Sequence, residues 1–269
     1  MRWARSGHVE QPRREIEVAA RSLKLATKLV DEGADVNAVG TEGEDQESTP
    51  LWWAARALVV YLQIPGALDL ATLLVEKGAN VSAVGSPAGA GGGQTTSPLW
   101  WAAVAVHGGT VEGAAELATL LVAKGADVNA VGADTGGYEC TPLWWAAWAV
   151  CEDKAGGLEL ATLLVEHGAD VNAVGKVNRE DDDCKSSALW RAAQTVWERE
   201  EGGLQLATLL VQHGADVIAL GEDEDGNVGR GCHSVSRAKA WCLLIHADAA
   251  FSLPLFPSLS LRGFHSFTF

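Results

Sequence analysis

The sequence predicts an all-α fold built from repeated pairs of helices. The string LATLLVEKGANVSAVG from Leu70 returns with small changes from Leu117, Leu160 and Leu206, and an earlier copy starts at Leu25. A second string, TPLWWAARALVV from Thr49, returns as SPLWWAAVAV from Ser97 and TPLWWAAWAV from Thr141. Both strings carry apolar residues at helical spacing. Each pair of helices can therefore bury its apolar side only against the next copy.

The first helix of each pair starts at a hydroxyl residue followed by proline. Thr49-Pro50, Ser97-Pro98 and Thr141-Pro142 share this pattern. The hydroxyl can accept a hydrogen bond from an unpaired amide, and proline at the first helical position loses no donor that the helix needs. Counted from the leucine after the proline, small or apolar residues fall at +3, +4 and +7, which is one face of an α-helix.

The second helix of each pair is apolar on more than one side and ends at a glycine. These glycines are Gly33, Gly78, Gly125, Gly168 and Gly214, separated by 43 to 47 residues. A residue without Cβ can adopt the left-handed conformation that closes a helix. The aspartates and asparagines that follow are expected to bond the local backbone of a turn.

With TPL-x-x-AA opening one helix and LL-x-x-GADVNA closing the next, the chain resembles the ankyrin repeat family. The resemblance covers Leu25 to Gly221. It implies helix-turn-helix units stacked into a curved solenoid with long finger loops. It also implies that partners are held by the fingers and by the inner helices.

The chain departs from the family pattern in two respects. The period of 43 to 47 residues exceeds the usual value of about 33. Tryptophan takes the place of the signature histidine, which leaves open how the hydrogen bonds of that histidine are replaced. These tryptophans are Trp52, Trp100, Trp144 and Trp190.

The repeats divide the chain into segments. We expect a degenerate N-terminal helix or cap over residues 1–24 and a half-unit over 25–40. Full units follow at about 41–85, 86–132, 133–175 and 176–221, then a C-terminal cap over 222–251 and a disordered tail over 252–269. The last unit departs from the others, with SAL at Ser187 and DVIALG at Asp216, as expected for a unit at the end of an array.

Comparison between the units separates framework from candidate binding positions. The first tryptophan, at +1 from the leucine, occurs in all four units, so we interpret it as packing between units. The +2 position reads Trp53, Trp101, Trp145 and Arg191. Arg191 indicates partial exposure, and a ladder of exposed indoles would form a strong binding surface, although a structural role is equally consistent with the sequence.

Positions +5, +8 and +9 vary freely and lie away from the core stripe or at its border. Together with the +2 positions they give the candidate partner-binding residues. These are Trp53, Trp101, Trp145, Arg191, Arg56, Val104, Trp148, Gln194, His107, Trp197, Glu152 and Glu198.

Composition and motifs exclude several classes of function. A formal charge of -15 disfavours nucleic acid, and no apolar run is long enough to span a membrane. Five scattered cysteines favour a reducing, cytoplasmic or nuclear location. We find no catalytic context, no cofactor motif and no spacing typical of a metal site.

The leading hypothesis is a non-enzymatic scaffold for protein–protein interaction. Acidic residues in the expected fingers, such as those over 180–183, predict a partner with a neutral or basic surface. The alternative is the substrate-targeting portion of a larger, truncated enzyme or signalling protein. Self-association is a third hypothesis, and the sequence does not fix the oligomeric state.

Overall fold

The structure is a computed structural model. It describes residues 10–41, 47–60, 66–86, 95–109, 113–134, 137–179, 182–197 and 201–217. The expected segments at 222–251 and 252–269 lie outside these residues.

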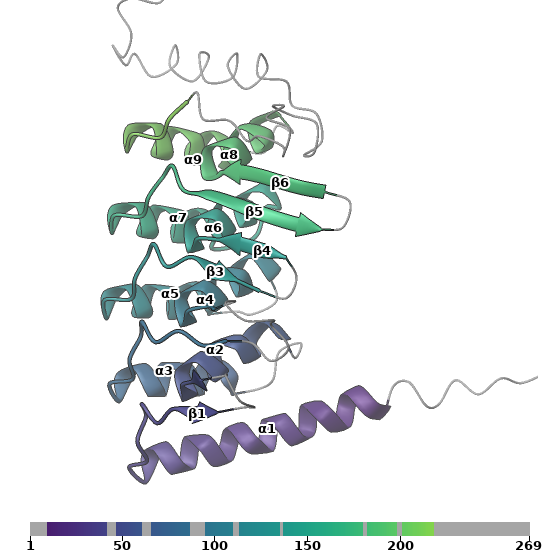
Figure 1. Ribbon diagram of the computed structural model, residues 1–269, viewed down its shortest axis with the longest axis vertical. Coiled ribbons are helices and arrows are strands. Elements are labelled where there is room, and N and C mark those ends of the chain that lie inside the picture. The colour runs from purple at the N-terminus through teal and green to yellow at the C-terminus, as the bar shows by residue number, and fades with distance from the viewer. Residues whose placement is uncertain are drawn as a thin grey trace, which may run out of the picture.

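The described residues form one long helix followed by four helix pairs. The long helix is α1 (Glu10–Asp31). The pairs are α2 (Pro50–Val60) with α3 (Ala67–Glu76), α4 (Pro98–Gly108) with α5 (Ala114–Ala123), α6 (Pro142–Cys151) with α7 (Gly157–Glu166), and α8 (Ala188–Trp197) with α9 (Glu201–Gln212). Figure 1 shows the pairs lying one above another in a stack. Successive first helices contact each other, as do successive second helices, which confirms a helical repeat fold.

Paired strands connect the units, so the fold is mostly helical rather than purely α as predicted. β1 (Gly40–Thr41) pairs with β2 (Glu47–Ser48). Further along, β3 (Gly132–Ala133), β4 (Tyr138–Cys140), β5 (Val174–Arg179) and β6 (Asp182–Ser187) form one antiparallel sheet in that order. Main-chain hydrogen bonds hold these strands. Because that pairing needs no apolar alternation, the strands could not be predicted from the sequence.

The expected helix starts are mostly present. The hydroxyl oxygens of Thr49, Ser97 and Ser187 accept hydrogen bonds from the amides of Trp52, Trp100 and Trp190, at 3.1 to 3.3 Å. Thr141 makes no such bond. The helix ends also follow the prediction: Gly78 has a φ of 90°, and the amide of Ala79 bonds back to the Leu74 carbonyl.

The asparagines after these glycines bond the next unit, which corrects the expectation of local bonds. The side-chain oxygen of Asn129 accepts from the Asp170 amide at 2.7 Å, and its amide group donates to the Gly168 carbonyl at 3.1 Å. Asn37 and Asn172 bridge their neighbouring units in the same way. The aspartates, and Asn80 at the same place in its unit, bond locally: Asp127, for example, accepts from the amide of Asn129. The turns are therefore joined along the stack.

α1 is one continuous helix and crosses the boundary expected at residue 24. Leu25 and Leu29 are 58% and 47% exposed. Their counterparts Leu70 and Leu74 are buried, because α2 covers α3. α1 has no such first helix among the described residues and packs on α3.

Candidate interaction surface

The +1 tryptophans join each unit to the next. Trp52, Trp100 and Trp144 are 0 to 1% exposed. Their Nε1 atoms donate to the carbonyl oxygens of Thr96, Cys140 and Ser186 at 2.9 to 3.0 Å. Each acceptor directly precedes the hydroxyl residue that starts the next first helix. The structural interpretation of the +1 indoles is therefore confirmed, and the indole N–H supplies a hydrogen bond between units.

The backbone of a glycine packs closely against the ring of each of these indoles. A Cβ added to Gly85, Gly132 or Gly175 would come within 2.4 to 2.8 Å of ring atoms of Trp52, Trp100 or Trp144. Such contacts are too close for a real Cβ atom. The +1 tryptophan therefore requires glycine at the last position of the AVG tripeptide. The recurrence of AVG in the sequence could have suggested this relation.

The +2 tryptophans are mostly buried, which corrects the expectation of an exposed ladder. Trp101 and Trp145 are 5% and 3% exposed. Each lies edge-on to the +1 indole of the preceding unit, Trp101 at 6.2 Å from Trp52 and Trp145 at 5.6 Å from Trp100 between ring centroids. Edge-to-face contacts at these distances are favourable. The stack itself uses these side chains, so they are not available as an open surface.

Arg191 occupies the same +2 place in the last unit and is also buried. Its guanidinium carbon lies 4.3 Å from the ring centroids of both Trp144 and Trp148. A cation over an indole face is stabilised by the ring quadrupole. Burial lowers the pKa of Arg191, while Cys151 and other neighbours act in the opposite direction. Arginine at +2 thus reflects a cation–π contact between units rather than the exposure that the sequence suggested.

Trp53 differs from the later +2 tryptophans, since no +1 indole precedes it among the described residues. It is half-buried. The guanidinium carbon of Arg56 lies 5.1 Å from its ring centroid. The first +2 indole is therefore the most accessible of the three.

Several N–H groups in this layer are buried without a hydrogen-bond partner in the described part of the chain. They are Arg56 Nε, Trp101 Nε1, Trp145 Nε1 and Arg191 Nε. A buried donor without an acceptor costs about 1 to 3 kcal/mol. Ring packing and cation–π contacts must therefore hold this layer together.

The +5 side chains form the accessible line on the first helices. Arg56, Val104, Trp148 and Gln194 are all half-buried. Their side chains are a cation, an aliphatic group, an indole and an amide, whereas the +1 position is tryptophan in every unit. Variable side chains on an invariant framework are where specificity is expected.

A polar cluster borders this line between the second and third units. His107 Nε2 lies 3.5 Å from Glu152 Oε1, and Lys154 Nζ lies 3.7 Å from Glu152 Oε2. The His107 ring also packs on Trp145 and Trp148. Burial lowers the pKa of His107, and the Glu152 carboxylate partly opposes that shift. The side chain of Trp197 and the whole of Glu198 lie outside the described residues.

The described residues hold no group of three or more His, Cys, Asp or Glu side chains arranged for a metal ion. Burial raises the pKa of the Cys140 thiol, which disfavours the reactive thiolate. Cys151 accepts a hydrogen bond from the Thr195 hydroxyl at 2.7 Å and contacts the Arg191 carbonyl. Both thiols belong to the packing between units.

No helix in the part of the chain that the structure describes is long and apolar enough to cross a membrane.

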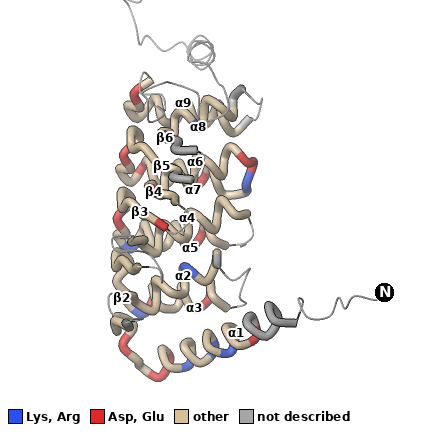
Figure 2. The backbone as a smooth tube through the Cα atoms, turned by 45° about the vertical axis from the view of Figure 1, so that its right-hand side comes forward, with Lys and Arg blue, Asp and Glu red and all other residues tan. Residues whose placement is uncertain are grey.

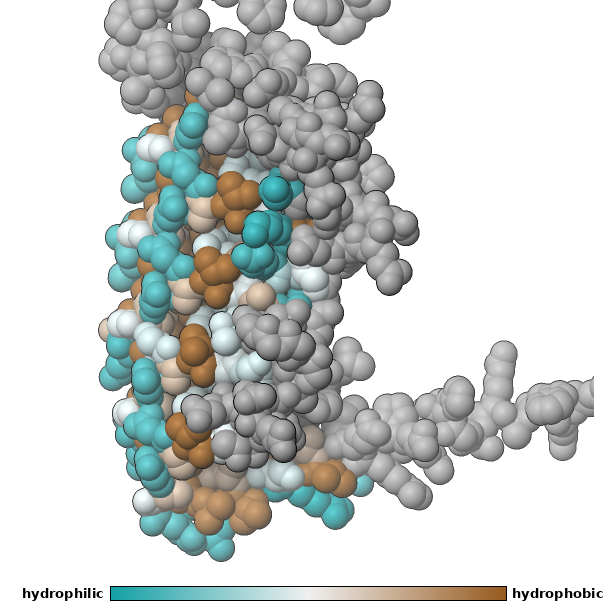
Figure 3. All heavy atoms as spheres, in the orientation of Figure 1, coloured by the Kyte–Doolittle hydropathy of each residue, from teal (hydrophilic) through white to brown (hydrophobic). Residues whose placement is uncertain are grey.

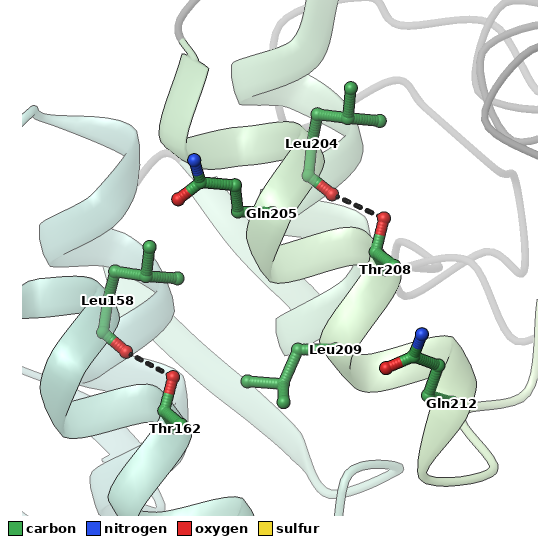
Figure 4. Close-up of a pocket in the computed structure, with 7 residues that line it drawn as sticks. All are labelled: Leu158, Thr162, Leu204, Gln205, Thr208, Leu209 and Gln212. Atoms are coloured by element: carbon green, nitrogen blue, oxygen red, sulfur yellow. Dashed lines mark hydrogen bonds between the residues drawn. The ribbon is translucent and has the colours of Figure 1, made fainter. Parts of the chain in front are cut away.

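A shallow hollow of about 480 Å³ lies between α7 and α9. Figure 4 shows its lining residues, Leu158 and Thr162 from α7 and Leu204, Gln205, Thr208, Leu209 and Gln212 from α9. The hydroxyls of Thr162 and Thr208 each donate to a carbonyl in their own helix at 2.8 Å. The hollow therefore presents no polar group that points to a reaction.

Comparison with known proteins gives a family match in the third unit. Residues 138–176, from β4 to the start of β5, match the ankyrin repeat model. Among solved structures, the chain is similar to the crystal structure of the Legionella pneumophila effector AnkC, with 16% identity and a TM-score of 0.44. The match covers 88% of this chain and 66% of that one, just under two thirds. No curated protein matches the sequence.

Proposed function

We propose that this chain, whose residues 138–176 match the ankyrin repeat model, is a non-enzymatic ankyrin-repeat scaffold that binds a protein partner through its inner helices and finger loops. In this proposal the stack is a curved solenoid whose first helices line the concave side. Residues of the +5 line make the specific contacts. The polar cluster of His107, Glu152 and Lys154 lies at its edge.

The observation that carries the proposal is the contrast between the +1 and +5 positions. The +1 indoles are buried and identical in every unit. The +5 side chains are half-buried and differ in every unit. Trp148 also packs on His107 and Arg191 of the neighbouring units, but the four +5 side chains share no common packing partner, and recognition of a partner accounts for their variety. The +2 tryptophans Trp101 and Trp145 then support the surface from beneath, and Trp53 extends it.

The charge of the chain supports a partner with a neutral or basic surface. The formal net charge is -15, which repels nucleic acid on average and attracts basic proteins. The predicted acidic fingers, such as residues 180–183, lie largely outside the described residues. We propose that the protein acts in a reducing, intracellular compartment.

The proposal is tested by quantitative affinity capture with matched variants of the full chain. One variant combines Arg56→Gln, Val104→Thr and Gln194→Ala on the first helices. The control combines Glu116→Gln, Glu159→Gln and Gln205→Ala on the second helices. We expect the first variant to lose about tenfold in affinity for the captured protein and the control to bind normally, with thermal unfolding as the check on folding.

Two results would contradict the proposal. The first is equal binding by both variants, which would place the contact surface elsewhere. The second is catalytic turnover of a substrate by this chain alone. An association rate that does not change with salt concentration would contradict only the proposed role of charge.

A further inference from the structure

A row of exposed valines runs along the stack beside the strands. Val39, Val84, Val131 and Val174 are 58%, 54%, 56% and 51% exposed. Each occupies the same place in its unit, directly before the glycine that packs against an indole or its counterpart Gly40. Figure 3 shows hydrophobic residues recurring at each level of the stack, next to a polar column. The alanine before each valine, such as Ala83 or Ala130, is at least partly exposed and widens the row.

Copying of the repeat does not explain why valine recurs. Other exposed positions in the same block have diverged: one reads Glu76, Ala123, Glu166 and Gln212, and the next reads Lys77, Lys124, His167 and His213. The valines are not among the residues packed against the core. This position is valine in four copies and Leu220 in the last, so it stays apolar, and its exposure in the four described copies indicates a contact outside the chain.

The spacing of the row selects the conformation of its ligand. Helices in neighbouring units pack about 8–10 Å apart, and because the valines occupy equivalent places in their units, we expect successive valines to be separated by roughly that distance. In a β-strand, residues on one side recur every ~6.7 Å, which does not match. A polyproline II helix has three residues per turn and rises ~3.1 Å per residue. Its side chains therefore recur on one side every ~9.3 Å, once per unit of the stack.

The charges beside the row select the composition of that ligand. Asp35, Asp127 and Asp170 are exposed and stand four residues before a valine. One carboxylate oxygen of each accepts a local amide, and the negative charge remains at the surface. Figure 2 shows acidic residues recurring along one edge of the stack, with some basic residues among them. Basic residues between the apolar positions of a ligand would complement this edge.

We propose that the valine row binds a proline-rich, basic peptide segment in the polyproline II conformation, with one apolar side chain at every third position. Each apolar side chain packs on one Ala-Val pair, and lysines or arginines between them face the aspartates. The surface is a line of residues separate from the +5 line on the first helices. It extends the proposed function to a second surface, and either surface can fail its test without the other.

The test uses the full chain and a labelled 12-residue peptide made of four Leu-Pro-Lys triplets. The control peptide has the same composition, shuffled so that leucine no longer recurs every third residue. Fluorescence anisotropy is expected to give at least tenfold tighter binding for the regular peptide. Val84→Thr combined with Val131→Thr keeps the side-chain shape and should weaken that binding about tenfold. A chain with Ala123→Ser and Gln212→Ala, two exposed neutral positions outside the row, should bind like the unmodified protein.

Three outcomes would overturn the proposal. They are equal binding of both peptides, unchanged binding by the valine double variant, and no binding at millimolar peptide. Thermal unfolding of each variant shows that it is folded. An acidic version of the regular peptide, with glutamate for lysine, should bind more weakly, and equal binding would contradict the role of the aspartates.

Discussion

The indole N–H of Trp100 donates a hydrogen bond at 3.0 Å to the carbonyl oxygen of Cys140, 40 residues farther along the chain. Cys140 ends β4, and Trp100 belongs to the first helix of the preceding unit. The bond therefore fixes the start of one unit to the core of another. Trp52 and Trp144 make the same contact one unit earlier and one unit later. Stability should thus depend on these bonds between units as well as on the helix pairs themselves.

We expect Trp100→Phe to lower the free energy of unfolding by about 1–3 kcal/mol. The substitution keeps an aromatic ring but leaves the buried Cys140 carbonyl without its donor and opens a small cavity. Urea unfolding followed by circular dichroism measures the loss. Trp53→Phe is the matched control, because Trp53 is half-buried and should cost clearly less. Equal losses would show that the hydrogen bond contributes little.

The glycines that touch the indoles give a second prediction. Gly132→Ala would place a methyl group about 2.4 Å from Trp100 Cδ1, so the ring or the strand must move, and we expect a loss of about 1–3 kcal/mol. Gly40 is its counterpart before the first full unit. Among the described residues, a Cβ there meets only the Ser48 carbonyl oxygen, at 4.0 Å. Gly40→Ala should therefore be nearly neutral in the same urea assay, and a similar loss in both variants would refute the clash.

The helix pairs could be predicted from the sequence because capping, spacing and repetition indicate the same boundaries. The starts at Thr49, Ser97 and Thr141 and the ends at Gly78, Gly125 and Gly168 follow from local chemistry. Burial of the +1 indoles also followed, from their presence in every unit. The strands could not be predicted, since their residues pair through the main chain whatever their side chains are. Lys176 lies opposite Lys185, and Asp183 lies opposite Asn178.

The site was harder to predict because burial at the +2 position depends on the unit before it. Trp101 is buried because its edge contacts Trp52, 49 residues earlier in the chain. Arg191 looked like a sign of exposure, yet its guanidinium lies over Trp144. A charge on a helix does not reveal that a neighbouring unit offers an aromatic face. The valine row was missed because an exposed valine has no distinctive local signal.

Ser82 breaks the pattern of bridging asparagines and gives a stabilising prediction. Its hydroxyl is 3.5 Å from the Gly125 carbonyl and 3.3 Å from the Asp127 amide. Asn129, at the same place one unit later, makes these two contacts at 3.1 and 2.7 Å. Ser82→Asn should therefore shorten both bonds and raise the free energy of unfolding by about 0.5–1.5 kcal/mol. Asn129→Ser should lower it by a similar amount. A loss of stability in Ser82→Asn, or a gain in Asn129→Ser, would reject the bridging role.

The lowered pKa of His107 leads to a prediction of how stability depends on pH. Burial lowers its pKa below the ordinary 6.5, while Glu152 partly opposes the shift and Arg191 and Lys154 add to it. Below pH 6.5 the unfolded chain therefore takes up a proton more readily than the folded chain, so stability falls as the pH drops through that value. We expect a lower urea midpoint at about pH 5.5 than at about pH 7.5, and a smaller difference in His107→Gln. If the variant loses as much stability as the unmodified chain over this interval, the pH dependence must arise at another group.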